Sequence, residues 1–116
     1  MDVEAFNAAW LEAWSNKDVA TLLTQYHPEV TYKDAQTVAG ITGQEALGTY
    51  LTGLFAAMPP TRYTPDQVWP IEGGFCGRWY AEMELAGGSK RKMRGFDLCL
   101  LRDGRIVHNE VYTHQL

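Results

Sequence analysis

The chain has few of the residues that nucleophilic or metal-dependent catalysis needs. Its 116 residues include only two serines, two cysteines and three histidines. Ser15 and Ser89 have neither a histidine nor a glycine-rich elbow beside them, which argues against a serine nucleophile. The histidines are widely scattered, and the spacing of Cys76 and Cys99 does not fit a zinc site. We therefore expect no metal, no cofactor and two reduced, buried thiols.

The sequence also lacks a long apolar run and an excess of basic charge. Without a run of about 20 apolar residues we expect no membrane partner, and no basic region followed by an apolar one marks a signal peptide. The net charge is −4, and the basic residues gather only at 90–92 and Arg94. We therefore expect a cytoplasmic protein with no nucleic-acid partner, in which this basic cluster is a solvated hairpin tip.

What is present is the composition of an ordinary globular protein. Apolar residues make up 46% of the chain and charged residues 21%, which is typical of soluble domains. A chain of this length can bury one sizeable core but not two. We therefore expect a single domain over residues 1–116.

Three stretches in the first half have the periodicity of amphipathic helices. Residues 3–15 carry an aromatic side chain at every fourth position, Trp10 among them. Asp18 can cap a second, short helix. Thr42 and Glu45 fit a capping box at the start of a third helix, which a methionine and two prolines end.

Strand patterns occupy the rest of the chain. Alternation over residues 29–34 places Val30, Tyr32 and Asp34 on one face of a strand. From residue 61 onward, glycine pairs and the dipeptide Asp103-Gly104 separate four strand-like stretches, as expected for consecutive hairpins. The order predicts an α+β protein with its helices on one side of a strongly curved antiparallel sheet.

One acidic residue interrupts the most apolar of these strands. An ionised carboxylate at Asp97 would be costly to bury, so this side chain either faces a cavity or partner or is kept neutral by its surroundings. If Asp97 faces inward, the alternate residues Phe96, Leu98 and Leu100 face the other side. That second face is too apolar for open water, which predicts a homodimer through the sheet face.

Three local stretches follow one another in a characteristic order. An aromatic helix before Asn16-Lys17-Asp18 is followed by residues 26–34 and then by Gly95-Phe96-Asp97 leading to Asp103-Gly104. This order resembles the NTF2-like superfamily, specifically its SnoaL-like polyketide cyclase and ketosteroid-isomerase-like branch. The resemblance covers nearly the whole chain and implies a cone-shaped fold, with three N-terminal helices packed on the concave face of the sheet. It says less about the reaction, because the fold hosts isomerases, cyclases, hydrolases, dehydratases and binding modules.

The resemblance gives roles to two aspartates. Asp34 matches the general base of ketosteroid isomerases, and Asp97 matches both their oxyanion-binding aspartate and the acid/base of SnoaL-like cyclases. Three positions depart from these families. Trp10 stands where the isomerases have a tyrosine, Met83 where the cyclases have a histidine, and Val111 where limonene-epoxide hydrolases have an aspartate. An indole N–H can donate a hydrogen bond but cannot act as an acid.

The register of the family also predicts which side chains converge. The last strand is expected to turn Val107, Asn109, Val111 and Thr113 inward. Asp34 and Asp97 are the predicted catalytic residues. The predicted substrate contacts are the side chains that surround them: Trp10, Tyr32, Trp79, Met83, Asn109 and Val111. An apolar pocket with few polar groups is typical of a small-molecule site.

Two carboxylates in one apolar cavity should have separated pKa values, so that one acts as a base and the other as a proton donor. We therefore expect a cofactor-independent acid/base enzyme of the isomerase or cyclase type, acting on a small apolar carbonyl compound such as a steroid or polyketide. Two alternatives stay open. One is a non-catalytic small-molecule-binding or accessory module. The other is a hydratase or epoxide-hydrolase-like enzyme, which would need a polar, water-holding cluster that Val111 does not supply.

Overall fold

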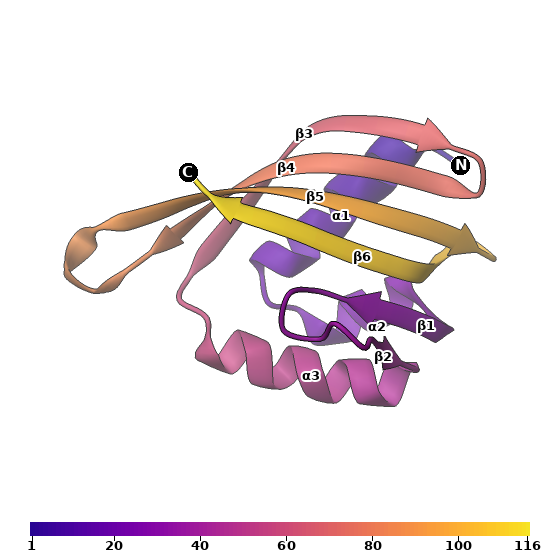
Figure 1. Cartoon of the computed structure of the whole chain (residues 1–116), viewed down its shortest axis with the longest axis horizontal. Helices are drawn as coiled ribbons and strands as arrows, with labels where there is room; N and C mark the ends of the chain where they lie inside the picture. The colour runs from indigo at the N-terminus through magenta and orange to yellow at the C-terminus, as the bar shows by residue number, and fades with distance from the viewer.

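Three helices pack against one curved six-stranded sheet (Figure 1). The computed structural model describes residues 1–116. The elements are α1 (Val3–Ser15), α2 (Val19–Gln25), β1 (Tyr26–Lys33), β2 (Ile41–Thr42), α3 (Gln44–Ala57), β3 (Thr61–Ile71), β4 (Gly74–Glu84), a short turn η1 (Ala86–Gly88), β5 (Lys90–Arg102) and β6 (Arg105–Gln115). The expected α+β cone is confirmed. None of the helices combines the length and apolar character that a membrane-spanning segment needs.

Aspartate caps fix the starts of the first two helices. The Asp2 carboxylate accepts a hydrogen bond from the Ala5 amide at 3.0 Å. The Asp18 carboxylate does the same for the Thr21 amide at 3.1 Å, so its predicted capping role is confirmed. Each cap satisfies a backbone donor that has no partner inside the helix. The two helices are therefore bounded by local chemistry.

The start of α3 differs from the prediction. The capping box at Thr42 is wrong: the N-cap is Gly43, at φ 92°, and it makes no side-chain capping hydrogen bond. Thr42 instead lies in β2, where it pairs with Thr31 of β1. The other end of α3 is held from outside, because the Lys17 ammonium donates to the Met58 carbonyl at 2.6 Å.

The strands are ordered β2-β1-β6-β5-β4-β3. The four strands from β3 to β6 pair antiparallel, as predicted. The sheet as a whole is mixed, however, because β1 runs parallel to β6, with Tyr32 opposite Asn109. Parallel neighbours need a long connection, and here most of the chain separates the two strands. Strand β3 lies at the edge, where its prolines are tolerated.

A bulge in β6 changes which side chain enters the core. His108 pairs with Leu100, but Ile106 pairs with Leu101, so Val107 is left over between two pairs. Ile106 is fully buried, whereas Val107 is only partly buried. The prediction that Val107 points inward is therefore wrong. An inserted residue reverses the alternation on one side of it.

Aromatic contacts join α1 to the sheet and to α3. The Trp14 ring meets Phe55 edge-on at 5.2 Å and Tyr63 at 6.0 Å, and it stacks on Tyr32 at 6.4 Å. Such pairs add about 0.5–1.5 kcal/mol each to the stability gained from burial alone. They hold α1, α3, β1 and β3 around one point on the concave side, where the pocket described below opens.

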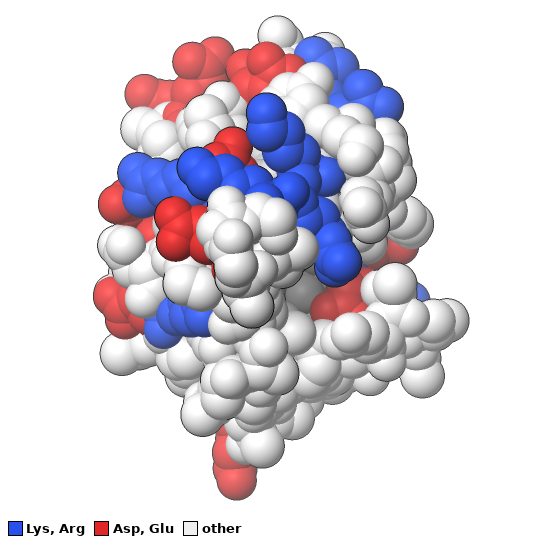
Figure 2. Space-filling view, turned by 90° about the vertical axis from the view of Figure 1, so that its left-hand side faces the viewer, with Lys and Arg blue, Asp and Glu red and all other residues white.

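The basic cluster of residues 90–92 and Arg94 lies in the projecting part of the β4–β5 hairpin. Figure 2 shows that Lys and Arg side chains there are mixed with Asp and Glu. Lys90 pairs with Glu82 at 2.8 Å, and Arg62 pairs with Glu12 at 3.0 Å; all four side chains are at least 40% exposed. The arrangement is that of a solvated, charge-balanced surface.

Candidate active site

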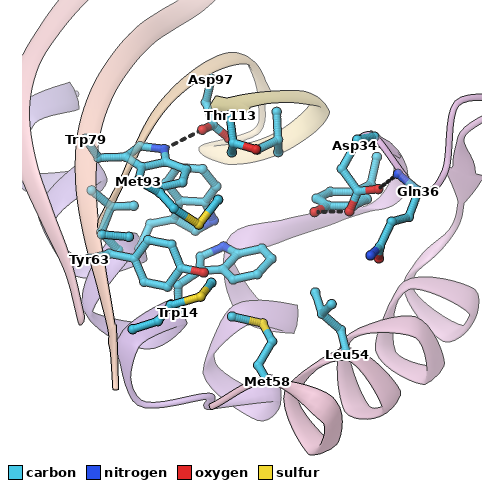
Figure 3. Close-up of a pocket in the computed structure, with 17 residues that line it drawn as sticks. Trp14, Asp34, Gln36, Leu54, Met58, Tyr63, Trp79, Met93, Asp97 and Thr113 are labelled. Carbon is cyan, nitrogen blue, oxygen red and sulfur yellow. Dashed lines mark hydrogen bonds between the residues drawn. The ribbon is translucent and has the colours of Figure 1, made fainter. Parts of the chain in front are cut away.

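A pocket of about 200 Å³ lies on the concave side of the sheet (Figure 3). Seventeen residues line it, and thirteen of them are hydrophobic. The four others are Asp34, Gln36, Asp97 and Thr113. Drug-sized ligands occupy pockets of roughly 300–1,000 Å³, so this pocket suits a smaller molecule.

The structure brings most of the predicted site residues together. The pocket is lined by Trp10, Tyr32, Asp34, Trp79, Met83, Asp97 and Val111. Asn109 does not line it and is fully buried behind Asp97. Their roles in binding or catalysis stay predictions.

Asp97 is a buried carboxyl group held by two side-chain donors. It is 2% exposed. The Trp79 indole N–H donates to its Oδ1 at 2.6 Å, and the Asn109 amide donates to its Oδ2 at 2.8 Å. Burial raises the pKa of Asp97 to about 7, although these two hydrogen bonds lower it. The group is thus balanced between its acid and base forms near neutral pH, the condition that favours general acid/base work.

Gly95 allows Trp79 to reach Asp97. Trp79 and Gly95 face each other across the β4–β5 pair. A Cβ on Gly95 would lie 2.1 Å from Cζ2 of the Trp79 indole, a distance that no side chain can occupy. The missing side chain is therefore what lets the indole lie across β5 and point its N–H at the carboxyl group. Sequence reasoning placed both residues inward but did not link them.

Tyr26 fixes the amide that holds Asp97. Its buried hydroxyl donates to Oδ1 of Asn109 at 2.8 Å. This leaves the NH₂ end of the Asn109 amide facing Asp97, where only a donor stabilises the ionised carboxylate. Burial raises the pKa of Tyr26 well above its usual value, so it stays a donor. The sequence pattern did not single out Tyr26, which lies at the junction of α2 and β1.

Asp34 occupies a different part of the same pocket, and it is hydrogen-bonded on all sides. Its Oδ2 accepts from the hydroxyls of Tyr32 at 2.9 Å and Tyr50 at 2.6 Å. Its Oδ1 accepts from the backbone amide of Gln36 at 2.9 Å and from the Thr37 hydroxyl at 3.0 Å. Burial alone would raise the pKa of Asp34, but these donors together lower it below its usual value. A carboxylate offers about four acceptor positions, and here all are used.

The aromatic wall contains both enclosed and free polar groups. The rings of Trp10 and Trp14 line the pocket, but their indole nitrogens are sealed inside the protein without a hydrogen-bond acceptor. Tyr63, which sequence reasoning did not single out, enters from β3 and lines the pocket as well. Tyr63 lies opposite Ala81 in the β3–β4 pair, and Ala81 also lines the pocket. Knowledge of this register would therefore have identified Tyr63 as a pocket residue. No cluster of three or more side chains in the chain could hold a metal ion.

An open, curved sheet whose concave side is closed by three helices around an apolar pocket defines the NTF2-like fold. The sequence profile of the SnoaL-like domain family matches residues 7–109. The chain belongs to this family. No curated protein matches it in sequence.

Solved structures share this fold at low identity. A hypothetical protein with a ketosteroid isomerase-like fold from Catenulispora acidiphila, in complex with trimethylamine, has a TM-score of 0.80 over 92% of this chain and 83% of its own, at 18% identity. TerC, co-crystallised with polyporic acid, has a TM-score of 0.80 over 97% and 90%, at 15% identity. A Mycobacterium tuberculosis protein in complex with estradiol-17β-hemisuccinate has a TM-score of 0.76 over 95% of this chain and 92% of its own, at 17% identity. At these identities the likeness shows the fold alone.

Proposed function

We propose that the protein is a cofactor-independent acid/base enzyme that moves a proton next to the carbonyl group of a small, largely apolar compound. The reaction is of the isomerase or cyclase type. The observation that carries the proposal is Asp97, a fully buried carboxyl group on the wall of an apolar pocket with a pKa raised to about 7. Membership of the SnoaL-like family, and the small molecules bound by proteins of the same fold, support this class of function.

In this mechanism, Asp97 as a carboxylate takes a proton from the carbon next to the carbonyl and later returns it to carbon. The Trp79 and Asn109 donors hold both carboxyl oxygens in place during the cycle. We assign the transfer to Asp97 rather than to Asp34, because four donors already occupy the acceptor positions of Asp34. Asp34 then serves as a fixed negative group beside the substrate.

The size of the pocket supports a substrate at the small end of the expected range. A cavity of about 200 Å³ lies below the usual volume for drug-sized ligands. A ketone of about two fused rings suits it better than a steroid. Three methionines in the lining, Met58, Met83 and Met93, supply a soft wall that adapts to ligand shape.

Hydrogen–deuterium exchange tests the proposal without knowledge of the natural substrate. In deuterated buffer, the wild-type protein should speed up exchange at the carbon next to the carbonyl of 1-tetralone, 2-tetralone or a β,γ-unsaturated cyclohexenone, followed by proton NMR. The Asp97→Asn protein should lose at least hundredfold of that acceleration. Equal exchange rates for the wild-type and Asp97→Asn proteins would contradict the role of Asp97.

A non-catalytic binding module is the second candidate. It is favoured by the saturated hydrogen bonding of Asp34 and by the enclosed indole nitrogen of Trp10, which leave two expected roles unfilled. Ligand binding without any exchange in the assay above would select this candidate. The hydratase reading receives no such support, because Val111 lines the pocket where that chemistry needs a polar group.

We also propose a homodimer through the convex face of the sheet. That face exposes Trp69, Phe96 and Tyr112 by 39%, 40% and 61% of their surface. Close to these aromatic residues, Arg78 is already paired with Asp66 at 2.6 Å, and its guanidinium lies over the Trp69 ring. A second copy covering the aromatic patch would therefore not leave this charge without a partner. A Phe96→Glu protein should be monomeric by light scattering; an unchanged mass would refute this interface.

A further inference from the structure

Tyr63 presents a free phenol to the pocket. Its ring is held between two tryptophans, edge-on to Trp79 at 5.0 Å and to Trp14 at 6.0 Å. Figure 3 shows the hydroxyl end pointing away from β3 toward the middle of the pocket. The hydroxyl donates to no atom of the chain; the hydrogen bond that Tyr63 makes to Ser15 comes from its backbone amide. The side chain is thus rigid while its polar end is unused.

The indole and amide donors near Asp97, and the Tyr26 hydroxyl behind them, are already engaged or enclosed. The Trp79 indole and the Asn109 amide donate to Asp97 itself, and the Tyr26 hydroxyl donates to Asn109. The indole nitrogen of Trp10, at the position where the resemblance predicts an oxyanion-binding donor, has no access to the pocket. Thr113 also lines the pocket, but it is an exposed residue of β6. For a substrate oxygen held against the aromatic wall, the Tyr63 hydroxyl is the donor that no other group engages.

We propose that the Tyr63 hydroxyl binds the carbonyl oxygen of the substrate and thereby determines which carbon faces Asp97. This inference rests on the proposed function for its chemistry. As Asp97 removes a proton from carbon, negative charge develops on the carbonyl oxygen, and a donor fixed in advance stabilises it. The phenol keeps its own proton throughout, so the only proton transferred is the one that moves between carbon and Asp97.

The position of Tyr63 near Asp97 supports these two roles, in which Tyr63 binds the carbonyl oxygen and Asp97 transfers the proton. Trp79 touches the Tyr63 ring with its own ring and Asp97 with its N–H, so the two polar groups lie on either side of one indole. Burial and the charge of Asp97 raise the pKa of Tyr63. The phenol is consequently a hydrogen-bond donor over the whole range in which Asp97 titrates.

Binding of a ketone and its parent hydrocarbon tests the inference. Tetralin lacks the oxygen of 1-tetralone, and quenching of tryptophan fluorescence reports the binding of both. The Tyr63→Phe protein keeps the ring and should bind 1-tetralone about three- to tenfold more weakly, with unchanged affinity for tetralin. Tyr80→Phe, which removes a hydroxyl from the opposite face of the sheet, should bind both like the wild type.

Several outcomes would overturn the inference. It fails if the wild-type protein binds 1-tetralone no better than tetralin, or if Tyr63→Phe weakens both equally. Unfolding midpoints of the variants exclude a loss of fold as the cause. The exchange assay keeps the two proposals separate: a selective loss of ketone binding in Tyr63→Phe with no exchange by the wild type supports Tyr63 as a binding group and refutes the enzyme. Where exchange occurs, Tyr63→Phe should lower it about hundredfold.

Discussion

The two ends of the pocket hold the same functional group in opposite states. At one end, Asp97 is buried on the wall of the pocket with two nitrogen donors, and its pKa rises to about 7. At the other, Asp34 lies in the loop after β1 with four donors, and its pKa falls below the usual value. Burial opposes ionisation at both ends, but it is nearly complete at Asp97 and only partial at Asp34, so the depth of burial and the number of donors together decide the outcome. An aspartate in a pocket is therefore not by itself a base or an acid.

Replacing each aspartate separately gives the largest expected difference. Asp97→Asn should lower the exchange activity at least hundredfold, whereas Asp34→Asn should lower it less than tenfold, because only Asp97 changes its protonation in the cycle. Proton NMR exchange rates at pH 7 measure both. A larger loss in Asp34→Asn than in Asp97→Asn would reverse the assignment of the base.

The two ends should also differ in how they make stability depend on pH. The folded-state pKa of Asp97 is raised from 3.8 to about 7, so its contribution is fully present below about pH 3.8 and is lost as the pH rises through 7. The loss amounts to about 4 kcal/mol. Asp34 behaves oppositely, since its stabilising effect is present above its unfolded pKa and is lost as the pH falls through the lowered folded value.

Urea unfolding at a series of pH values measures this difference. The Asp97→Asn protein should have a flatter dependence between pH 4 and 8 than the wild type, and the Asp34→Asn protein should be flatter only at acid pH. Identical slopes for the wild type and Asp97→Asn would show that the pKa of Asp97 is not raised.

A side chain at position 95 should displace groups around Asp97 and leave the part of the pocket around Asp34 unchanged. Gly95→Ala would place its Cβ 2.1 Å from the Trp79 ring, so the indole must move and its hydrogen bond to Asp97 is lost. Overpacking of this kind costs about 1–3 kcal/mol. Thermal unfolding and tryptophan fluorescence report both effects. Gly53→Ala in α3 is the matched control, because its Cβ meets nothing within 4 Å. Equal effects of the two substitutions would refute the idea that Gly95 makes room for the Trp79 indole.

The smallest expected effect concerns Tyr26. Without its hydroxyl, in Tyr26→Phe, the Asn109 amide can turn and offer its oxygen to Asp97, which favours the protonated carboxyl group. The pKa of Asp97 should then rise by about one unit or less. Carbon NMR titration of the Asp97 carboxyl measures this shift, with Tyr112→Phe as the control on the outer face. A lowered pKa would show that Tyr26 does not orient the amide.

Much of the fold follows from local sequence. Asp103 and Gly104 both adopt positive φ, 54° and 74°, as the turn between two long strands requires. The helix caps and the aromatic spacing are equally local. The parallel pairing of β1 with β6 and the bulge at Val107 were not predictable in this way, because they depend on partners distant in the chain.

The candidate site also has features that follow from local sequence and features that depend on distant partners. Alternation along a single strand separates its two faces, since period two is a local property. The resemblance to the family then indicates that the face with Asp97, Trp79 or Val111 points inward. The hydrogen bonds that set the protonation of the two aspartates come from other parts of the chain. Tyr26, at the junction of α2 and β1, acts on Asp97 through Asn109, and Tyr50 of α3 donates to Asp34. Sequence patterns therefore locate the carboxyl groups but do not give their charge states.

The parallel pairing of β1 with β6 has a consequence for the order of folding. Tyr32 and Lys33 of β1 obtain their β6 partners from Asn109 and Glu110, which the ribosome adds about 75 residues later. Until then β1 has only the two-residue strand β2 beside it, and such non-local contacts form late. The wall between Tyr26 and Asp97 can therefore form only after β6 has been synthesised.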